Sequence, residues 1–191
     1  MTPVEILEKS QALLNGHFLY TSGNHGSQYM QCAKVLQNPA YATAMIAHLV
    51  PQIKALDAQL VIAPAMGGIL VGYELARQLD TRSIFAEREN GVMTLRRGFT
   101  IPAGTRTIIA EDVVNTGKSV REVMAITQAA GADLVAIAAL VDRTGGEIDF
   151  GVPFYSAYST KMAIYTPDEC PICQEGTLEL VKPGSRVQPV K

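Results

Sequence analysis

The stretch TIIAEDVVNTGKSV at positions 107–120 constrains the fold of this chain more than any other. An apolar run ends in two adjacent carboxylates, Glu111 and Asp112, and a small polar loop then leads into an amphipathic segment. This order predicts a buried strand, a loop and the N-terminus of a helix. Unpaired N–H groups of a first helical turn, the helix dipole and a flexible Gly117 all favour a bound phosphate. We therefore expect a phosphate site beside a pair of acids.

A second strand-to-helix turn lies earlier in the chain. The short apolar run 61–63 is followed by PAMGG at 64–68 and by a helical pattern at 69–79. Turn chemistry that leads into a helix start is again suited to an anion, although a glycine pair in this place is more often only a tight turn.

Apolar runs of strand length alternate with helical patterns along most of the chain. Of its residues, 48% are hydrophobic and 18% are charged, enough apolar material for one core. The alternation predicts an α/β fold with an open parallel sheet flanked by helices, in which ligands bind at the carboxyl ends of the strands. We expect helices at 3–14, 39–56 (bent near Pro51), 69–79 and 117–130, and strands at 60–63, 83–87, 93–98, 107–111, 134–141 and 153–158.

The segment 85–98 has the pattern of a hairpin. Asn90 and Gly91 lie between apolar flanks, the strongest short signal for a two-residue turn. Arg96 and Arg97 then belong to the return strand of a hairpin that projects from the sheet. Adjacent basic residues of this kind are usually ordinary solvated charges, and that alternative stays open.

One rival interpretation concerns nucleoside triphosphates. Gly117, Lys118 and Ser119 end like the phosphate loop of a triphosphatase, and the run 134–142 ends in Asp142, which could hold a metal. The first glycine of that loop, however, is replaced by Asp112, whose charge opposes a phosphate. The triphosphatase remains a second hypothesis.

The apolar strand, the paired acids and the T-G-x-S loop resemble the phosphoribosyl pyrophosphate (PRPP) motif of the type I phosphoribosyltransferases. The resemblance implies that the acids hold the ribose hydroxyls, that the loop holds the 5′-phosphate, and that the turn at 64–68 holds pyrophosphate with a cis bond between Ala65 and Met66. Anionic groups near a cationic ribose suit glycosyl transfer. PRPP binding is thereby assigned to Glu111, Asp112, Val113, Val114, Asn115, Thr116, Gly117, Lys118, Ser119, Ala65, Met66 and Gly67.

Three further stretches resemble the orotate-specific members of that family: GHFLYTSGNHGSQY at 16–29, Asp142 with Arg143, and PDECPICQEGTLELVKPGSR at 167–186. An arginine fork matches the carboxylate of orotate, the base that these members use. The alternative is that Arg143 merely pairs with Asp142 or Glu147 on the surface. The resemblance assigns orotate binding to Asn115, Arg143, Ser22, Gly23 and Tyr29.

The chain departs from the family pattern at several positions. Asn115 replaces a usual Thr or Ser, Lys118 replaces Gly or Thr, and Thr21 stands where some members have a lysine. The loop at 87–98 lacks the lysine and histidine that reach pyrophosphate in better-known members. The arginines of this loop could neutralise the charge of pyrophosphate, but they cannot donate a proton at neutral pH. If a proton donor is needed, His25 is the candidate. The expected catalytic residues are Glu111, Asp112, Arg88, Arg96 and Arg97.

The resemblance also implies a cofactor, an assembly and a division of the chain. Mg²⁺ is expected between pyrophosphate and ribose, held mostly by water and substrate oxygens, so that no protein metal ligand is assigned. A homodimer is expected. Residues 1–191 form a single domain, with a hood from 1–35 and 160–191 and a core at 36–159. A transferase for another base, such as a purine, and a regulator that senses PRPP without turnover are the alternatives.

Composition excludes several other classes of protein. Apolar runs are interrupted well before 18 residues, so no membrane span is expected. Without a secretory pattern at the N-terminus, we expect a cytoplasmic protein. A net charge of −2, with no basic stripe, predicts no binding to nucleic acid.

The three cysteines, an odd number, suit a reducing compartment. Cys170 and Cys173 form a C-x-x-C pair that could be half of a zinc site. Structural zinc needs four ligands, and the rest of the chain offers only Cys32 and three histidines without ligand spacing, namely His17, His25 and His48. A dimer could supply a second pair, but on this reasoning zinc is not expected.

Overall fold

The structure is a computed structural model that describes residues 1–20 and 22–183. Thr21 and residues 184–191, which include the end of the KPGSR motif, lie outside the described residues. The main sheet has six strands, and the five other than β5 run parallel. The predicted open parallel sheet is confirmed. Its strands, from one edge to the other, are β5 (Val92–Leu95), β4 (Arg82–Glu89), β3 (Leu60–Pro64), β6 (Arg106–Val114), β7 (Asp133–Asp142) and β8 (Phe154–Ser159).

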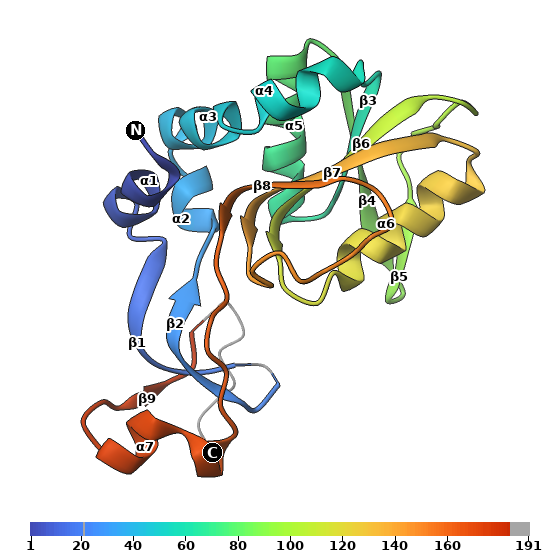
Figure 1. Cartoon of the computed structure of the whole chain (residues 1–191). Coiled ribbons are helices and arrows are strands. Elements are labelled where there is room, and N and C mark those ends of the chain that lie inside the picture. The colour runs from blue at the N-terminus through green and yellow to red at the C-terminus, as the bar shows by residue number, and fades with distance from the viewer. Residues whose placement is uncertain (21, 184–191) are drawn as a thin grey trace.

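Helices cover both faces of this sheet (Figure 1). On β3, Val61 and Ala63 point to one face, where α3 (Pro39–Ala47) and α5 (Gly67–Leu79) pack. Leu60 and Ile62 point to the other face, against α6 (Lys118–Ala129). Because successive side chains of a strand alternate between faces, a strand between two helical layers must be apolar throughout.

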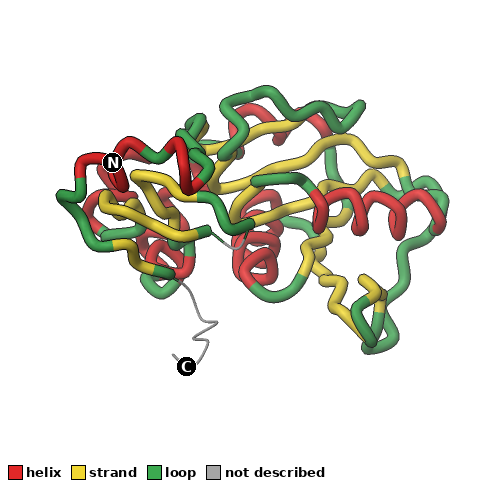
Figure 2. The backbone as a smooth tube through the Cα atoms, turned by 90° about the horizontal axis from the view of Figure 1, so that it is seen from below, coloured by secondary structure: helices red, strands yellow, loops and turns green. Residues whose placement is uncertain are grey.

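The order of strands places a ligand crevice between β3 and β6. The chain leaves β3 through α5 to β4 on one side, and leaves β6 through α6 to β7 on the other. Loops that diverge from neighbouring strands open a crevice at the carboxyl ends of those strands. The two strand-to-helix turns singled out in the sequence are the loops at this position. Figure 2 shows the strands, helices and connecting loops along the backbone from below.

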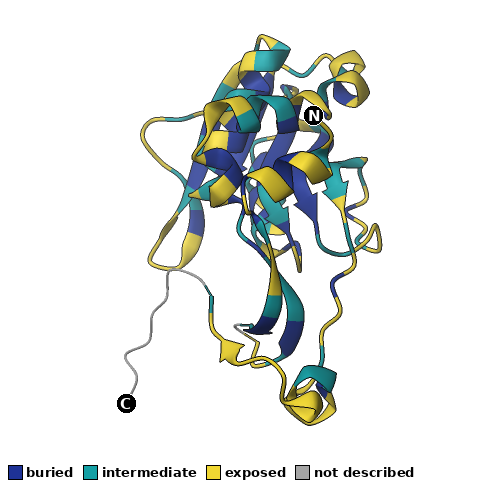
Figure 3. Ribbon diagram, turned by 90° about the vertical axis from the view of Figure 1, so that its left-hand side faces the viewer, coloured by how far each residue is buried: buried dark blue, intermediate teal, exposed yellow. Residues whose placement is uncertain are grey.

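A second, smaller sheet lies beside the core and is called the hood here. It pairs β2 (His25–Met30), β1 (Leu13–Leu19) and β9 (Leu180–Val181), the last from the C-terminal segment with α7 (Pro171–Glu175). Figures 1 and 3 show this sheet and α7 projecting from the main body. None of these elements was predicted as observed. The elements β9 and α7 have only two and five residues, and the first two residues of β1 were assigned to the helix predicted at 3–14.

The predicted helix at 3–14 is wrong in its second half. The helix α1 (Pro3–Lys9) begins with a Thr2–Glu5 capping box and ends where Gln11 adopts a positive φ of 54°. Leu13 and Leu14, which continued the helical pattern, belong to β1 and pair with β2 instead. Tertiary pairing outweighs local periodicity here.

Other boundaries differ by a few residues. The segment predicted as one bent helix at 39–56 is divided into α3, α4 (Val50–Ile53) and the 3₁₀ turn Lys54–Leu56, and Pro51 lies in the first turn of α4. The return strand of the hairpin stops at Leu95 rather than at 98, since Arg97 has a φ of 58°. The helix α2 (Ala33–Leu36) and the 3₁₀ turn Pro167–Glu169 were not predicted. In the described part of the chain, no helix is long and apolar enough to cross a bilayer.

Candidate active site

The acid pair lies near the carboxyl end of β6, inside the crevice. Glu111 is buried, and one of its carboxylate oxygens accepts a hydrogen bond from the Asp112 N–H at 3.0 Å. Asp112 is half-buried, and its Oδ1 accepts from the Val113 N–H at 2.8 Å. Both side chains are therefore fixed by the backbone that follows them.

The two carboxyl groups differ in environment. Burial, followed by the neighbouring Asp112 charge, raises the pKa of Glu111 to about 9. Glu111 therefore carries a proton at neutral pH, and it can donate a hydrogen bond where an ionised carboxylate could only accept one.

This raised pKa predicts a pH dependence of stability. The unfolded chain releases the Glu111 proton near its ordinary pKa of 4.5, whereas the folded chain retains it until about pH 9. The free energy of unfolding should therefore fall as pH rises between these values, by up to about 1.4 kcal/mol per pH unit. Glu111→Gln should remove this slope, so that the variant is more stable than the parent at pH 8 in denaturant titrations.

The exposed Glu8 on α1 provides a matched control. Glu8→Gln makes the same chemical change on the surface, and its stability curve should run parallel to that of the parent protein. A Glu111→Gln variant with the parent's pH slope would contradict the assignment of the proton to Glu111.

The turn after β3 packs directly against the acids. As predicted, the Ala65–Met66 bond is cis. A Cβ built on Gly67 would lie 2.1 Å from Asp112 Oδ2, and one on Gly68 would lie 3.2 Å from a Glu111 carboxylate oxygen. Glycine is therefore needed here for close approach, and the turn shares one crevice with the acid pair.

The loop after β6 encloses a second part of the crevice. A cavity of about 120 Å³ is lined by Glu111 and residues 113–120. Gly117 has a φ of 72° and caps α6, whose first-turn N–H groups and dipole favour an anion. Lys118 lines this cavity too.

A larger cavity of about 320 Å³ lies between this loop and the hood. It contains four of the five residues predicted to bind orotate, and the fifth, Gly23, lies in the turn between β1 and β2. Of the other lining residues, Val113 was assigned to PRPP, whereas the cation Lys182 of the C-terminal segment was not predicted as a site residue. The lining residues are Leu19, Tyr20, Ser22, Tyr29, Met30, Val113, Asn115, Arg143, Ile164, Lys182 and Pro183.

Arg143 is the strongest feature of this larger cavity. Its guanidinium lies over the Tyr20 ring at 5.2 Å, and its buried Nε has no hydrogen-bond partner among the described residues. The alternative surface pairing is wrong: Asp142 accepts from Thr144 and Gly146, and Glu147 pairs with Lys161. Because buried donors are rarely left unpaired, the orphaned Nε indicates a ligand.

Asp142 has a structural role at the end of β7. Burial alone would raise its pKa, but hydrogen bonds from Thr144, Ser159 and Gly146 lower the pKa of this carboxyl overall. Since its oxygens are occupied by these donors, Asp142 is poorly suited to hold the metal of a triphosphatase. Together with Asp112 in place of the first loop glycine, this argues against that hypothesis.

The arginines of the hairpin do not contact the acid pair in the described part of the chain. The turn at Asn90 and Gly91 forms as predicted, with both φ angles positive. Arg88 pairs with Glu122 of α6 and Arg97 with Glu87, while Arg96 lies 3.3 Å from Glu89 and 3.9 Å from Glu87. They are surface ion pairs, a type worth little to stability.

His25 is not positioned as a proton donor to the substrate. It is buried in the hood, where its Nδ1 lies 3.2 Å from both His17 Nε2 and Cys173 Sγ, and it does not line either cavity described above. The expectation that it could serve in catalysis is not supported by this placement.

Comparison with known proteins gives the family. Residues 33–156 match the model of the phosphoribosyl transferase domain. The chain is 51% identical to an orotate phosphoribosyltransferase of Heliobacterium modesticaldum, over 96% of each chain. It is 47% identical to an orotate phosphoribosyltransferase of Thermotoga maritima, over 95% of this chain and 97% of that one.

Solved structures share the fold at much lower identity. An orotate phosphoribosyltransferase from Aeropyrum pernix aligns with a TM-score of 0.68 at 24% identity, covering 82% of this chain and 93% of that one. An adenine phosphoribosyltransferase from Thermoanaerobacter pseudethanolicus aligns almost as well, with a TM-score of 0.65 at 17% identity, covering 80% of this chain and 99% of that one. The fold therefore does not choose the base, and that choice depends on the residues of the pocket.

Proposed function

Because the chain belongs to the orotate phosphoribosyltransferases, within the phosphoribosyl transferase family, we propose that its crevice transfers the phosphoribosyl group from PRPP to orotate. The products are orotidine 5′-monophosphate and pyrophosphate, a step of pyrimidine nucleotide synthesis. One observation of the structure supports a crevice that binds both substrates. The phosphate-loop cavity and the larger cavity adjoin, since Val113 and Asn115 line both.

Each part of the substrates has a matching part of the crevice. The 5′-phosphate binds the first-turn N–H groups of α6 and the loop 115–119, and Glu111 and Asp112 hold the ribose hydroxyls. Pyrophosphate lies along the turn at 65–67. The new bond forms between ribose C1′ and N1 of orotate as the bond from C1′ to pyrophosphate breaks, and the proton of N1 is released to pyrophosphate or solvent. The Asp112 carboxylate stabilises the positive charge that develops on the ribose, while the protonated Glu111 can hydrogen-bond a ribose hydroxyl.

Orotate binds in the larger cavity. Its carboxylate is bound by Arg143, whose buried Nε supplies an unsatisfied donor, and by the nearby cation Lys182. A purine has no carboxylate that could pair with these cations. Arg143 therefore supports orotate, rather than a purine, as the base that is transferred to. A PRPP sensor without turnover would not need a pocket with both cations next to the phosphate loop.

The proposal includes Mg²⁺ as cofactor. The Asp112 carboxylate, with Oδ2 beside Gly67 of the pyrophosphate turn, is a hard oxygen donor of the kind that Mg²⁺ prefers, directly or through water. When bound, Mg²⁺ would neutralise pyrophosphate charge and assist its departure.

The test of the proposed function is product identification. Purified protein with PRPP, orotate and Mg²⁺ should give orotidine 5′-monophosphate and pyrophosphate in equal amounts, and omission of Mg²⁺ should abolish turnover. Absence of both products at any Mg²⁺ concentration, with PRPP still bound in calorimetry, would favour the sensor.

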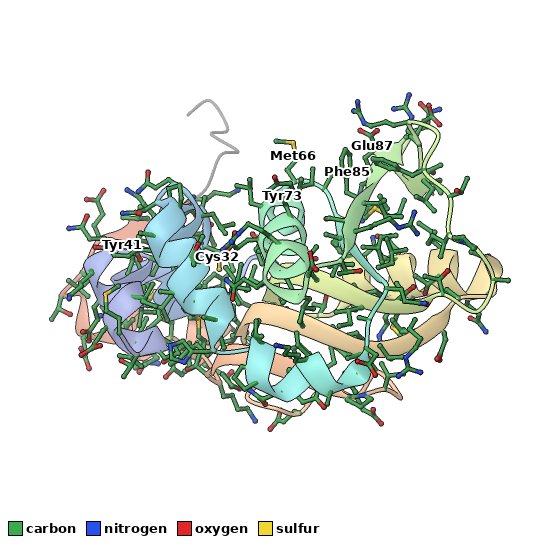
Figure 4. All side chains as sticks on the ribbon, turned by 90° about the horizontal axis from the view of Figure 1, so that it is seen from above. Cys32, Tyr41, Met66, Tyr73, Phe85 and Glu87 are labelled. Carbon is green, nitrogen blue, oxygen red and sulfur yellow. The ribbon has the colours of Figure 1, made fainter. Side chains whose placement is uncertain are left out.

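The proposal also includes a homodimer, formed through α5. Met66, Leu70 and Tyr73 are 83%, 54% and 64% exposed, and their spacing places them on one side of the helix. Figure 4 labels Met66 and Tyr73 on the same side of the molecule as Phe85 of β4. A row of exposed apolar side chains of this kind marks an interaction surface, which in a homodimer meets its own copy.

A double substitution tests this interface. Leu70→Glu with Tyr73→Glu should convert the dimer to a monomer in light scattering after gel filtration, because four charges would face one another across a two-fold axis. Val4→Glu, at an exposed apolar residue of α1, is the control and should leave the dimer intact. A parent protein that is monomeric at all concentrations would refute the dimer.

A cytoplasmic location is the last part of the proposal. It is supported by the three cysteines, all of them free thiols in the structure.

A further inference from the structure

The hood brings together four side chains that are distant in the sequence. His17 of β1, His25 of β2, and Cys170 and Cys173 at α7 each direct one possible metal-binding atom into the same place, and these four atoms lie within 4.8 Å of one another. For His17 and His25, the expectation that the histidines lack ligand spacing is therefore wrong in three dimensions, while His48 lies outside the cluster. Spacing along the chain cannot show it, because the strand pairing of the hood creates the cluster.

Four of the six distances between these atoms fit a tetrahedral metal site, and all six are within 4.8 Å. With Zn–N bonds near 2.05 Å and Zn–S bonds near 2.3 Å, a regular tetrahedron puts two nitrogens about 3.3 Å apart and a nitrogen and a sulfur about 3.6 Å apart. The two ring nitrogens, His17 Nε2 and His25 Nδ1, are 3.2 Å apart. The nitrogen–sulfur distances are 3.2 Å from His25 to Cys173, and 3.4 and 3.5 Å from His17 to Cys170 and Cys173.

Hydrogen bonding alone accounts poorly for this cluster. His17 Nδ1 lies 3.2 Å from the Leu178 carbonyl and must donate to it, since a carbonyl oxygen only accepts. Nε2 of the neutral ring then has one lone pair, yet three neighbouring atoms converge on it within 3.5 Å. A metal ion would engage all of them at once, and the Leu178 carbonyl is the outer partner that orients a metal-binding histidine.

The location of the cluster indicates a structural role. His17, His25 and Cys170 are buried, while the surrounding C-terminal segment is mostly exposed and has few apolar contacts of its own. Within that segment, α7 has five residues and β9 has two. A metal held between the β1–β2 hairpin and α7 would fasten this segment to the hood, as structural zinc does in small units with little core.

We propose that His17, His25, Cys170 and Cys173 form a structural zinc site that fixes the C-terminal segment against the hood. Two imidazoles and two thiolates in a closed tetrahedron favour Zn²⁺ over the oxygen-seeking Mg²⁺. The segment also supplies Ile164, Lys182 and Pro183 to the cavity assigned to orotate. Loss of zinc should therefore weaken orotate binding more than PRPP binding, a secondary effect that rests on the proposed function.

The primary test does not depend on activity. The full chain, purified without a histidine tag from zinc-supplemented cells and kept reduced, should contain one zinc per chain by mass spectrometry. Cys173→Ser, at an exposed ligand, and His17→Asn should each weaken zinc binding by at least about 100-fold, since loss of an outer-shell partner alone costs about 10- to 100-fold. Cys32→Ser and His48→Gln change the cysteine and the histidine outside the cluster and should keep the metal.

Cobalt provides a second readout of the same site. Co²⁺ added to the zinc-free protein should give the intense visible bands of a tetrahedral thiolate complex, and Cys173→Ser should alter them. Limited proteolysis should cut the segment 160–183 faster in the zinc-free protein. A fully reduced chain that binds neither Zn²⁺ nor Co²⁺, or a Cys170–Cys173 disulfide that persists with reductant, would overturn the proposal.

Discussion

Asp112→Asn should lower kcat by on the order of a hundredfold or more while the protein stays folded. The substitution keeps the shape of the side chain, and its amide oxygen can still accept the Val113 N–H that now bonds Oδ1. It removes the negative charge that faces the cation developing on the ribose. In other enzymes, preorganised groups of this kind stabilise the transition state by an amount that corresponds to such a loss of rate. Steady-state assays with PRPP and orotate both saturating measure the effect.

Stability separates this loss from misfolding. The Asp112 charge is one of the causes that raise the pKa of Glu111, so its removal should leave the thermal midpoint unchanged or higher. Asp133→Asn removes the same charge from an exposed residue at the amino end of β7 and should keep full activity. An active Asp112→Asn enzyme would remove Asp112 from the site.

Arg143→Ala should raise the KM for orotate by roughly 10- to 100-fold, since a hydrogen bond to a charged group contributes about 1.5–3 kcal/mol. The KM for PRPP should stay close to that of the parent, because Arg143 lines the larger cavity and not the phosphate-loop cavity. Initial rates with each substrate varied in turn separate the two constants.

Two further variants show what Arg143 contributes. Arg143→Lys keeps the charge but lacks the planar fork and the stack on Tyr20, so it should restore only part of orotate binding. Arg82→Ala, at an exposed arginine at the start of β4, should match the parent. An unchanged KM for orotate in Arg143→Ala would mean that the base binds elsewhere.

The sheet and the two anion loops could be predicted from the sequence for one physical reason. β3, β6 and β7 lie between two helical layers, so their apolar runs are continuous, and each anion loop begins directly after such a run. The type of each element and the position of Glu111 and Asp112 can then be predicted from the residues that adjoin them in the sequence. The family resemblance added the cis bond at Ala65 and the grouping of Ser22, Tyr29, Asn115 and Arg143, which the structure places around one cavity.

The hood could not be predicted in the same way. β1 is a strand because β2 and β9 pair with it, although Leu13 and Leu14 fit a helix equally well. That pairing, with the backbone bridge between His25 and Tyr165, brings the two histidines to Cys170. The pairing of β1 with β9 brings Lys182 to the larger cavity. Local pattern likewise could not show that the hairpin arginines are engaged by Glu87 and Glu122.

The most direct test of the central claim is base selectivity in one assay. Loss of orotate absorbance is followed after mixing protein, PRPP and Mg²⁺, with adenine, hypoxanthine and uracil as competing bases. The account predicts PRPP-dependent consumption of orotate that the other three bases do not slow, because they lack the carboxylate that Arg143 and Lys182 bind. Turnover of one of the other bases in place of orotate, or no turnover of any base, would contradict it.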